Sequence, residues 1–248
     1  MNSRVYDTAL FTHRGRVREE NQDAIFADGS VFQENLRDVI TMRLSGTPQA
    51  LAVADGIGGR PQGALASRSA LQFLGSDARL VRSEAACEEA LHAANEHLYG
   101  LMREPTCLGM GTTIAGFVVQ ERAVLSFNVG DSRSYRFSRG CLVRVSQDDV
   151  PMVVDRRADR PRGITQCLGG SEFPLGIMPH VFAGPPFEVG ECLMLCTDGL
   201  TEALDDGELA MLFRELAHPA AMVERLVRQG ISRGSRDNIS VLVSVAVA

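Results

Sequence analysis

Short apolar runs rich in β-branched residues recur along this chain, and polar turns of a few residues separate several of them. Gln120-Glu121-Arg122 and Ser138-Arg139-Gly140 are two such turns. Because so short a connection joins strands that run in opposite directions, the pattern favours antiparallel pairing. The runs that predict strands are 24–27, 51–54, 112–119, 123–129, 134–137, 192–196 and 240–247.

Helical spacing predicts two pairs of helices between these strands. The first helix is expected to begin near Pro61 and the second at Ser83. A third is expected around 209–216, and a fourth over 219–230 with Gly230 as its stop. The residues that mark buried faces are Ala66, Ala70, Phe73 and Leu74, then Cys87, Leu91, Ala94, Leu98 and Leu101, and then Leu209, Leu212, Phe213 and Leu216.

This order of elements is an α+β pattern rather than a βαβ repeat. We therefore expect two stacked antiparallel β-sheets, a β-sandwich, flanked by a pair of helices on each outer face. Hydrophobic residues make up 45% of the chain, which is enough for a sizeable core. No internal repeat or linker-like stretch marks a boundary, so residues 1–248 are expected to form a single domain.

Composition excludes several classes of protein. The formal net charge of −6 argues against a nucleic-acid or anionic-membrane partner, which usually requires a basic face. No run approaches the roughly 18 apolar residues of a spanning helix, and no signal-peptide core follows the polar start, so a cytoplasmic protein is expected. The six cysteines contain no C-x-x-C pair and are interpreted as reduced, buried thiols, and the five histidines lack the spacing of zinc ligands.

Aspartates stand at the ends of the predicted strands. Asp55, Asp131 and Asp198 follow strands, whereas Asp23 and Asp237 precede them. Because antiparallel neighbours end and begin at the same edge of a sheet, these five carboxylates could converge on one rim. A single Asp-Gly pair indicates only an ordinary turn. Five crowded carboxylates would repel one another unless cations lay between them, and hard oxygen ligands select magnesium, manganese or calcium.

The stretch Asp55-Gly56-Ile57-Gly58-Gly59 supports this prediction. Its three glycines allow the backbone to approach a metal or a phosphate closely and to present a carbonyl oxygen as a ligand. A nucleotide-binding loop is the alternative interpretation. The Gly-x-x-x-x-Gly-Lys-Ser/Thr pattern is absent, however, and no lysine follows to meet a phosphate.

Seven motifs occur in order between about residue 8 and residue 245. They are Gly15-Arg16-Val17-Arg18-Glu19-Glu20-Asn21-Gln22-Asp23-Ala24, Val53-Ala54-Asp55-Gly56-Ile57-Gly58-Gly59, Gly111-Thr112-Thr113, Val129-Gly130-Asp131-Ser132-Arg133, Thr165-Gln166-Cys167-Leu168-Gly169, Leu195-Cys196-Thr197-Asp198-Gly199-Leu200 and Arg236-Asp237-Asn238-Ile239-Ser240. Together they give a chain that resembles the metal-dependent serine/threonine protein phosphatase family (PPM, the type 2C enzymes) of the bacterial single-domain type.

The resemblance implies a site with two manganese or magnesium ions. Asp55 would bridge the two ions, the Gly56 carbonyl would bind one of them, and Asp198 with Asp237 would complete the pair. Asp23 would act mainly through metal-bound water.

The resemblance also implies a weaker third ion, held by Asp131 with Asp198. Arg18 would grip the phosphate, a role that suits the planar fork of a guanidinium. The implied reaction is direct hydrolysis of a phosphoserine or phosphothreonine ester by a hydroxide that bridges the two metals, with Arg18, Asp55 and Asp198 as the catalytic residues. No cysteine nucleophile is then required.

Two features depart from the family pattern. Ile57 stands where some relatives have a histidine, so no histidine is nominated as a catalytic acid. Between residues 146 and 170 the chain carries a short loop in place of a longer flap. Its arginines, Arg156, Arg157, Arg160 and Arg162, are hypothesised to dock an acidic or phosphorylated protein segment, the alternative being a solvated loop.

The expected partner is a phosphorylated protein whose phosphate a serine/threonine kinase supplies, and a monomer is expected. Members associated with type VI secretion are one candidate subgroup. The alternative function is a non-catalytic regulatory module that binds metal or phosphoprotein. Loss of a core aspartate usually marks such modules, but Asp55, Asp198 and Asp237 are all present.

Overall fold

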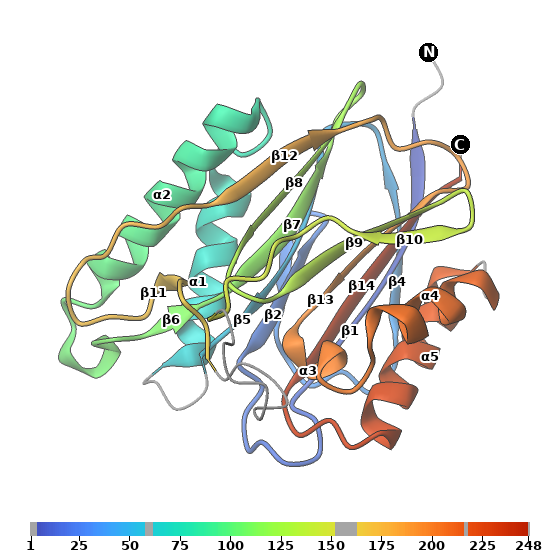
Figure 1. Cartoon of the computed structure of the whole chain (residues 1–248). Helices are drawn as coiled ribbons and strands as arrows, with labels where there is room; N and C mark the ends of the chain where they lie inside the picture. Colours follow the sequence, from blue (N-terminus) through green and yellow to red (C-terminus); the bar gives the residue numbers. More distant parts are fainter. Residues whose placement is uncertain (1–3, 58–61, 152–162, 216–217, 248) are drawn as a thin grey trace.

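Two six-stranded antiparallel sheets form the centre of the computed structural model, which describes residues 4–57, 62–151, 163–215 and 218–247 (Figure 1). The first sheet has the order β10 (Cys141–Arg144), β9 (Arg133–Ser138), β13 (Cys192–Cys196), β14 (Ile239–Ala246), β1 (Val5–His13), β4 (Ile40–Ser45). The second has the order β12 (His180–Gly184), β8 (Val124–Val129), β7 (Ile114–Val119), β5 (Gln49–Asp55), β2 (Asp23–Ala27), β3 (Ser30–Phe32). A short ladder joins β11 (Leu168–Gly169) to β6 (Gly111–Thr112).

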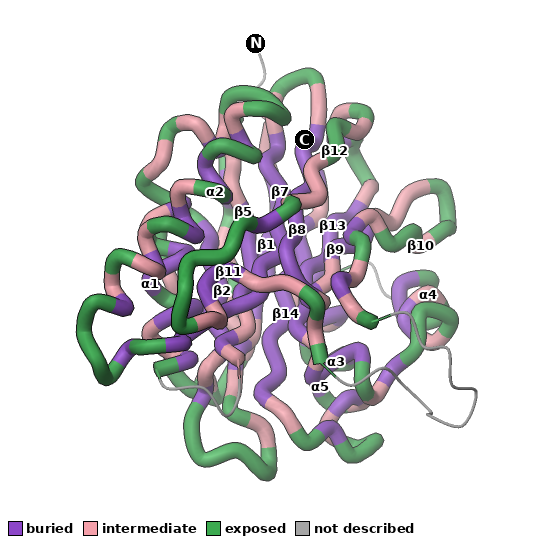
Figure 2. Tube along the Cα trace, turned by 60° about the vertical axis from the view of Figure 1, so that its left-hand side comes forward, coloured by how far each residue is buried: buried purple, intermediate pink, exposed green. Residues whose placement is uncertain are grey.

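The two sheets stack face to face, which confirms the predicted sandwich. Alternate residues of their strands point between them and form one core, which includes Leu10, Ile25, Phe117, Leu195 and Leu242. These side chains are almost completely buried, and Figure 2 shows the burial running through the middle of the molecule. The first and last strands of the chain, β1 and β14, pair along Tyr6–His13 and Ile239–Ala246.

Helices cover both outer faces, as predicted. Helices α1 (Gly63–Ser76) and α2 (Glu84–Leu101) pack on the second sheet through a cluster that contains Ala66, Leu91 and Phe127. Helices α3 (Asp198–Thr201), α4 (Asp206–Glu215) and α5 (Pro219–Ser232) pack on the first sheet through Leu209, Val223 and their neighbours. A short 3₁₀ helix, Pro105–Cys107, follows α2.

Every predicted run falls on strands of the structure, but the bounds agree only for 192–196 and shift by one or two residues in the other runs. The run 112–119 divides into β6 and β7 at Thr113. Sequence reasoning missed β1, β3, β4, β10, β11 and β12. Strands β1 and β4 alternate buried with more exposed positions, and polar residues such as Asp7 and Arg43 interrupt any apolar run.

The helix predictions hold in part. Ser83 caps α2 by accepting a hydrogen bond from the Ala86 amide at 3.3 Å. Gly230 does not stop α5, which was a wrong prediction: the helix continues to Ser232, and the glycine packs closely on Ile239. Phe73 and Leu101 are only partly buried on the predicted faces, and both Pro61 and Leu216 lie outside the described residues.

Within the described residues no disulfide joins any two of the six cysteines, and the thiols are not all buried as predicted. Cys141 is exposed on β10 and Cys167 is partly exposed, which corrects the prediction for these two residues. Within the described residues, no helix combines the length and apolar character needed to cross a membrane.

Candidate metal centre

Asp23 and Asp55 are direct partners on the neighbouring strands β2 and β5 of the second sheet. On the first sheet, Asp198 follows β13 and Asp237 precedes β14, and these two strands also pair. The two sheets meet at this end of the sandwich, where Thr197 donates from Oγ1 to Oδ2 of Asp23 at 2.8 Å. Both pairs of aspartates therefore lie at the same edge of the fold.

The charges of these aspartates act on one another. Burial raises the pKa of Asp55 well above its usual value, and Asp23, Asp198 and Asp237 raise it further. The pKa of Asp198 is raised by burial and then by Asp131 and Asp237. Asp55 and Asp198 also act on each other, since Asp198 raises the pKa of Asp55 and Asp55 lowers that of Asp198. The structure thus brings all five strand-end aspartates into one electrostatic cluster.

Two further pKa shifts have the same principal cause. Burial raises the pKa of Asp23 to about 7, against hydrogen bonds from Thr197 and Ser240 that lower it. Burial raises the pKa of Asp131 to about 6. Removing water from a carboxylate disfavours its charged form. The buried carboxyl groups at this edge of the fold are therefore favoured either when protonated or when bound to a cation.

Arg18 lies at the same place but contacts a carboxylate. Its Nε donates to Oδ1 of Asp237 at 2.8 Å, and its Nη2 donates to Oδ2. Within the described part of the chain, no three carboxylate, imidazole or thiol groups already surround one point at coordinating distance. In the described residues, the expected ligands therefore do not yet surround a common point. The carboxylate of Asp237 binds Arg18 rather than facing the other aspartates.

Two buried oxygens indicate that these residues suit a cation. Oδ1 of Asp23 and Oδ1 of Asp198 are buried and have no hydrogen-bond partner. A buried carboxylate oxygen without a donor is costly, and a divalent cation with its waters supplies the missing partner. Carboxylate and carbonyl oxygens are the ligands that magnesium and manganese take.

Gly56 is held in a position that only glycine can occupy. Its amide donates to the Gln22 carbonyl at 3.0 Å, and a Cβ atom there would lie 2.3 Å from the carbonyl oxygen of Gly63. The backbone of Gly56 therefore lies between the segment before Asp23 and the start of α1. Gly58 and Gly59, which completed this motif in the sequence, lie outside the described residues.

Sequence reasoning missed the side chains that hold the aspartates. Thr197 is fully buried between Asp23 and the Ser240 amide, from which it accepts a hydrogen bond at 3.1 Å. The Thr113 amide donates to the Asp55 carbonyl at 2.9 Å, and Thr112 donates to the same oxygen from Oγ1 at 2.8 Å. Thr112 and Thr113 belong to the motif Gly111-Thr112-Thr113, and that motif is the sequence signal that could have identified them.

Asn238 joins the loop that carries Arg18 to the loop that carries Asp237. Its side-chain amide donates to the carbonyls of Arg14 and Glu20, and its Oδ1 accepts from the Gln22 amide. The two loops lie so close that a side chain at Gly15 would collide with the Asp237 carbonyl. Asn238 therefore helps to fix Asp237 beside Arg18.

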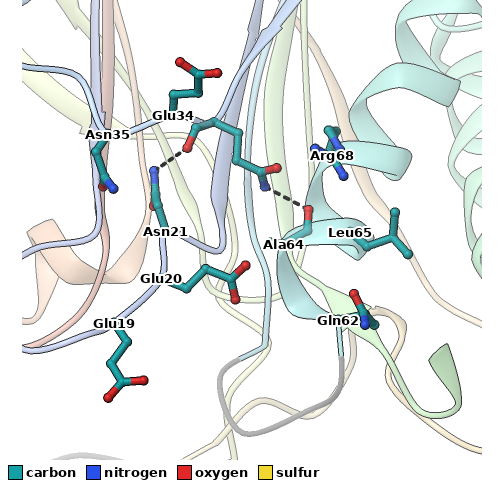
Figure 3. A pocket seen from close by; sticks show the side chains of 10 residues that line it. Glu19, Glu20, Asn21, Glu34, Asn35, Gln62, Ala64, Leu65 and Arg68 are labelled. Carbon is teal, nitrogen blue, oxygen red and sulfur yellow. Dashed lines mark hydrogen bonds between the residues drawn. The ribbon is translucent and has the colours of Figure 1, made fainter. Parts of the chain in front are cut away.

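A polar pocket of about 420 Å³ lies next to these loops (Figure 3). Asn21 and Gln33 cross it, with Asn21 donating to the Gln33 carbonyl and Gln33 donating to the Ala64 carbonyl. Its lining is Glu19, Glu20, Asn21, Gln33, Glu34, Asn35, Gln62, Ala64, Leu65 and Arg68. None of the five aspartates lines it, so the pocket lies beside the candidate metal centre and is not part of it.

The hypothesised arginine loop gives no structural result, because Arg156, Arg157, Arg160 and Arg162 lie outside the described residues. Ile57, at the position where some relatives have histidine, is partly exposed and donates its amide to the Gly111 carbonyl at 3.0 Å.

Known proteins resemble this chain over nearly its whole length. The serine/threonine protein phosphatase PstP of Mycobacterium tuberculosis is 28% identical over 255 residues, which cover 96% of this chain but 45% of PstP. The chain thus spans less than half the length of that relative. The serine/threonine phosphatase stp of Listeria innocua is 25% identical, with 94% of this chain and 92% of stp covered.

Solved structures share the fold. The catalytic domain of PstP in complex with two manganese ions superposes with a TM-score of 0.77 at 25% identity, covering 99% of this chain and all of that one. PppA, described as a regulatory component of the type VI secretion system in Pseudomonas aeruginosa, superposes with a TM-score of 0.75 at 27% identity and covers 97% of each chain.

The family model of protein phosphatase 2C matches residues 21–231. This match includes Asp23, Asp55, Asp131 and Asp198, the strand-end aspartates that precede α4. The chain belongs to the protein phosphatase 2C family.

Proposed function

We propose that this protein is a metal-dependent serine/threonine phosphoprotein phosphatase that hydrolyses phosphomonoesters directly. The observation that carries the proposal is the cluster of five strand-end aspartates, two of which bury an oxygen without a hydrogen-bond partner. Membership of the protein phosphatase 2C family and the names of the relatives support the same activity.

The residues that would hold two manganese or magnesium ions are Asp55, the Gly56 carbonyl, Asp198 and Asp237, with Asp23 acting through water. The PstP structure with two manganese ions supports this number and this metal. When bound, such ions neutralise phosphate charge and lower the pKa of water towards 7. A further, weaker ion is proposed between Asp131 and Asp198.

The chain's own residues would place the substrate. Arg18 is exposed and can offer its planar fork to two phosphate oxygens. In this structure that fork binds Asp237. We propose an exchange of partners, in which Asp237 turns to a cation and Arg18 turns to the phosphate. Thr197 keeps Asp23 oriented, and Thr112 and Thr113 fix the backbone at Asp55.

We also propose the type of substrate, the oligomeric state, the location, the domain organisation and the subgroup of the enzyme. The substrate would be a protein that a serine/threonine kinase has phosphorylated, and the enzyme would work as a monomer in the cytoplasm. Residues 1–248 would form one catalytic domain, which the pairing of β1 with β14 supports. The 27% identity with PppA supports a place among the phosphatases associated with type VI secretion.

The experiment that tests the proposal compares three phosphopeptides with one sequence, carrying phosphoserine, phosphothreonine or phosphotyrosine. Phosphate release is measured with manganese, with magnesium and with EDTA. Release from the first two peptides that stops in EDTA is expected. Manganese binding without release from any peptide would instead establish the non-catalytic regulatory module.

The arginine loop has its own test. Replacing Arg156, Arg157, Arg160 and Arg162 together with glutamine should slow turnover of a phosphoprotein and spare a small aryl phosphate. Equal effects on both substrates would reject docking by these arginines.

A further inference from the structure

Asp149 makes four hydrogen bonds, two of them to Gly130 in the turn that presents Asp131. Its amide donates to the Gly130 carbonyl at 3.0 Å, and its Oδ2 accepts from the Gly130 amide at 2.8 Å. Its carbonyl accepts from the Thr165 amide at 2.8 Å, and its Oδ1 accepts from Nε2 of His180 at 2.8 Å. The side chain and the backbone amide of Asp149 therefore bind both the amide and the carbonyl of Gly130, the residue before Asp131.

Asp149 is not itself a ligand candidate. Both of its carboxylate oxygens already have a donor, and the residue is only 9% exposed. His180 comes from β12, where it lies opposite Asn128 of β8. The Asn128 side chain in turn bonds to both the amide and the carbonyl of Gln147, at 3.1 and 2.7 Å. The segment 147–149 is thereby fixed to the end of β8.

The other side of the turn is held by threonine. Ser132 and Thr113 share a hydrogen bond between their hydroxyls at 2.7 Å, and both residues are buried. Gly130 has a φ of 100°, and a Cβ atom there would lie 2.7 Å from Thr113, so the turn cannot take another residue at this position. Asp131 thus stands between two fixed neighbours, Gly130 and Ser132.

The hydrogen bonds from Thr113 and those from Asp149 connect the turn to different parts of the protein. Thr113 links the turn to the backbone of Asp55, at the core of the metal centre. Asp149 links the turn to His180 of β12 and to Thr165, rather than to the four aspartates of that core. Loss of Asp149 should therefore disturb Asp131 and leave the other aspartates in place.

We propose that Asp149, oriented by His180, is a positioning residue that fixes the Gly130 peptide and so sets how strongly Asp131 binds a cation. The inference rests on the proposed function, which makes Asp131 a ligand of the weaker third ion. A carboxylate on a rigid turn loses less conformational freedom when it binds an ion than one on a loose turn.

The test measures manganese binding to the whole protein, with the free ion followed by electron paramagnetic resonance. The variants are Asp149→Ala, His180→Ala and the conservative His180→Gln, which can still donate to Asp149. The variant Asp131→Ala, which removes a proposed ligand of the third ion, identifies which binding event belongs to that ion. Asp7→Ala is the matched control, because Asp7 is a carboxylate paired with Arg43 near the start of β1, and β1 approaches the metal centre at its other end.

We expect Asp149→Ala and His180→Ala to weaken the third binding event about tenfold and to leave the two tighter events unchanged. His180→Gln should stay within about threefold of the wild type, and Asp7→Ala should match it. A third event unchanged in both alanine variants would overturn the inference, and so would equal weakening of all three events, because that marks a general structural role.

The failure of this inference can be told apart from failure of the proposed function. If the wild-type protein binds no manganese, the proposed metal centre is wrong and the inference falls with it. If Asp131→Ala weakens the third event but Asp149→Ala and His180→Ala do not, only the positioning role is wrong.

Discussion

Arg18 and Asp237 form an ion pair with two hydrogen bonds, although 219 residues separate them in the chain. Asn238 and the close contact at Gly15 bring their two loops together. The pair links the proposed phosphate ligand directly to a proposed metal ligand. Binding of a cation by Asp237 and binding of a phosphate by Arg18 would therefore favour each other, since each frees the partner that the other needs.

Replacing Arg18 should separate substrate binding from metal binding. We expect Arg18→Ala to raise KM for an aryl phosphate about tenfold or more, the range of a lost hydrogen bond to a charged group. Arg18→Lys should recover only part of this loss, because an ammonium group has no planar fork. The manganese concentration for half-maximal rate should not rise, because Asp237 loses a competitor. An unchanged KM with a higher manganese requirement would contradict the assignment of Arg18.

The stability of the metal-free protein should fall with rising pH. The pKa of Asp23 is raised to about 7, chiefly by burial, so the folded protein binds this proton more tightly than the unfolded chain does. The protonated group favours folding below the unfolded value near 4, and this contribution is lost as the pH rises through 7. In EDTA, we expect the free energy of unfolding to be about 1 kcal/mol lower at pH 8 than at pH 6.

The variant Asp23→Asn isolates this effect, because asparagine does not titrate. His13 acts in the opposite direction, since burial lowers its pKa, and it remains in both proteins. Urea unfolding at the two pH values should therefore show a smaller loss in Asp23→Asn than in the wild type. The same loss in both proteins would show that Asp23 is not the source.

Thr197 should contribute to stability through its hydroxyl. Thr197→Val keeps the shape of the side chain but leaves Oδ2 of Asp23 and the Ser240 amide without this partner. We expect it to lower the free energy of unfolding by about 1–3 kcal/mol. Thr197→Ser keeps the hydroxyl and should stay closer to the wild type. Urea unfolding of the three proteins checks this, and a serine variant less stable than the valine variant would contradict the role of the hydroxyl.

Gly199 should be intolerant of any side chain. A Cβ atom there would lie 1.9 Å from the Asn238 carbonyl oxygen, so Gly199→Ala must push the residue after Asp198 away from the residue after Asp237. We expect a loss of about 1–3 kcal/mol in stability and weaker manganese binding.

Gly100→Ala is the matched control for Gly199→Ala. Gly100 is exposed near the end of α2, and nothing lies within 4 Å of its added Cβ atom. Thermal unfolding should show this variant to be stabilised by up to about 1 kcal/mol, because alanine favours a helix more than glycine does. If both variants lowered stability equally, close packing at Gly199 would not be the cause.

The sequence predicts the sandwich because its central strands are apolar on both faces and therefore form recognisable runs. It also predicts that the five aspartates gather at one edge of the fold, because each stands next to such a run. Strands β1 and β4 escape this reasoning, since residues such as Asp7 and Arg43 face outward along them. The sequence predicts a helix stop at Gly230, because it does not show that Ile239 packs against this glycine.

The supporting residues of the site could not be predicted for a different reason. Thr197 contacts Asp23 across 174 residues, and His180 contacts Asp149 across 31. No local period or spacing reports such pairs. The proposed exchange of Arg18 between a carboxylate and a phosphate cannot be predicted from a motif either, because the motif identifies the residue and not its partner.

The most direct test of the central claim is phosphate release from a phosphothreonine peptide by the wild type and by Asp198→Asn, each with manganese and with EDTA. Asparagine has the shape of aspartate but no charge, and Oδ1 of Asp198 is one of the buried oxygens without a partner. We expect metal-dependent release by the wild type and a loss of about 100-fold or more in the folded variant. Wild-type release by a folded, manganese-saturated Asp198→Asn protein would contradict the account.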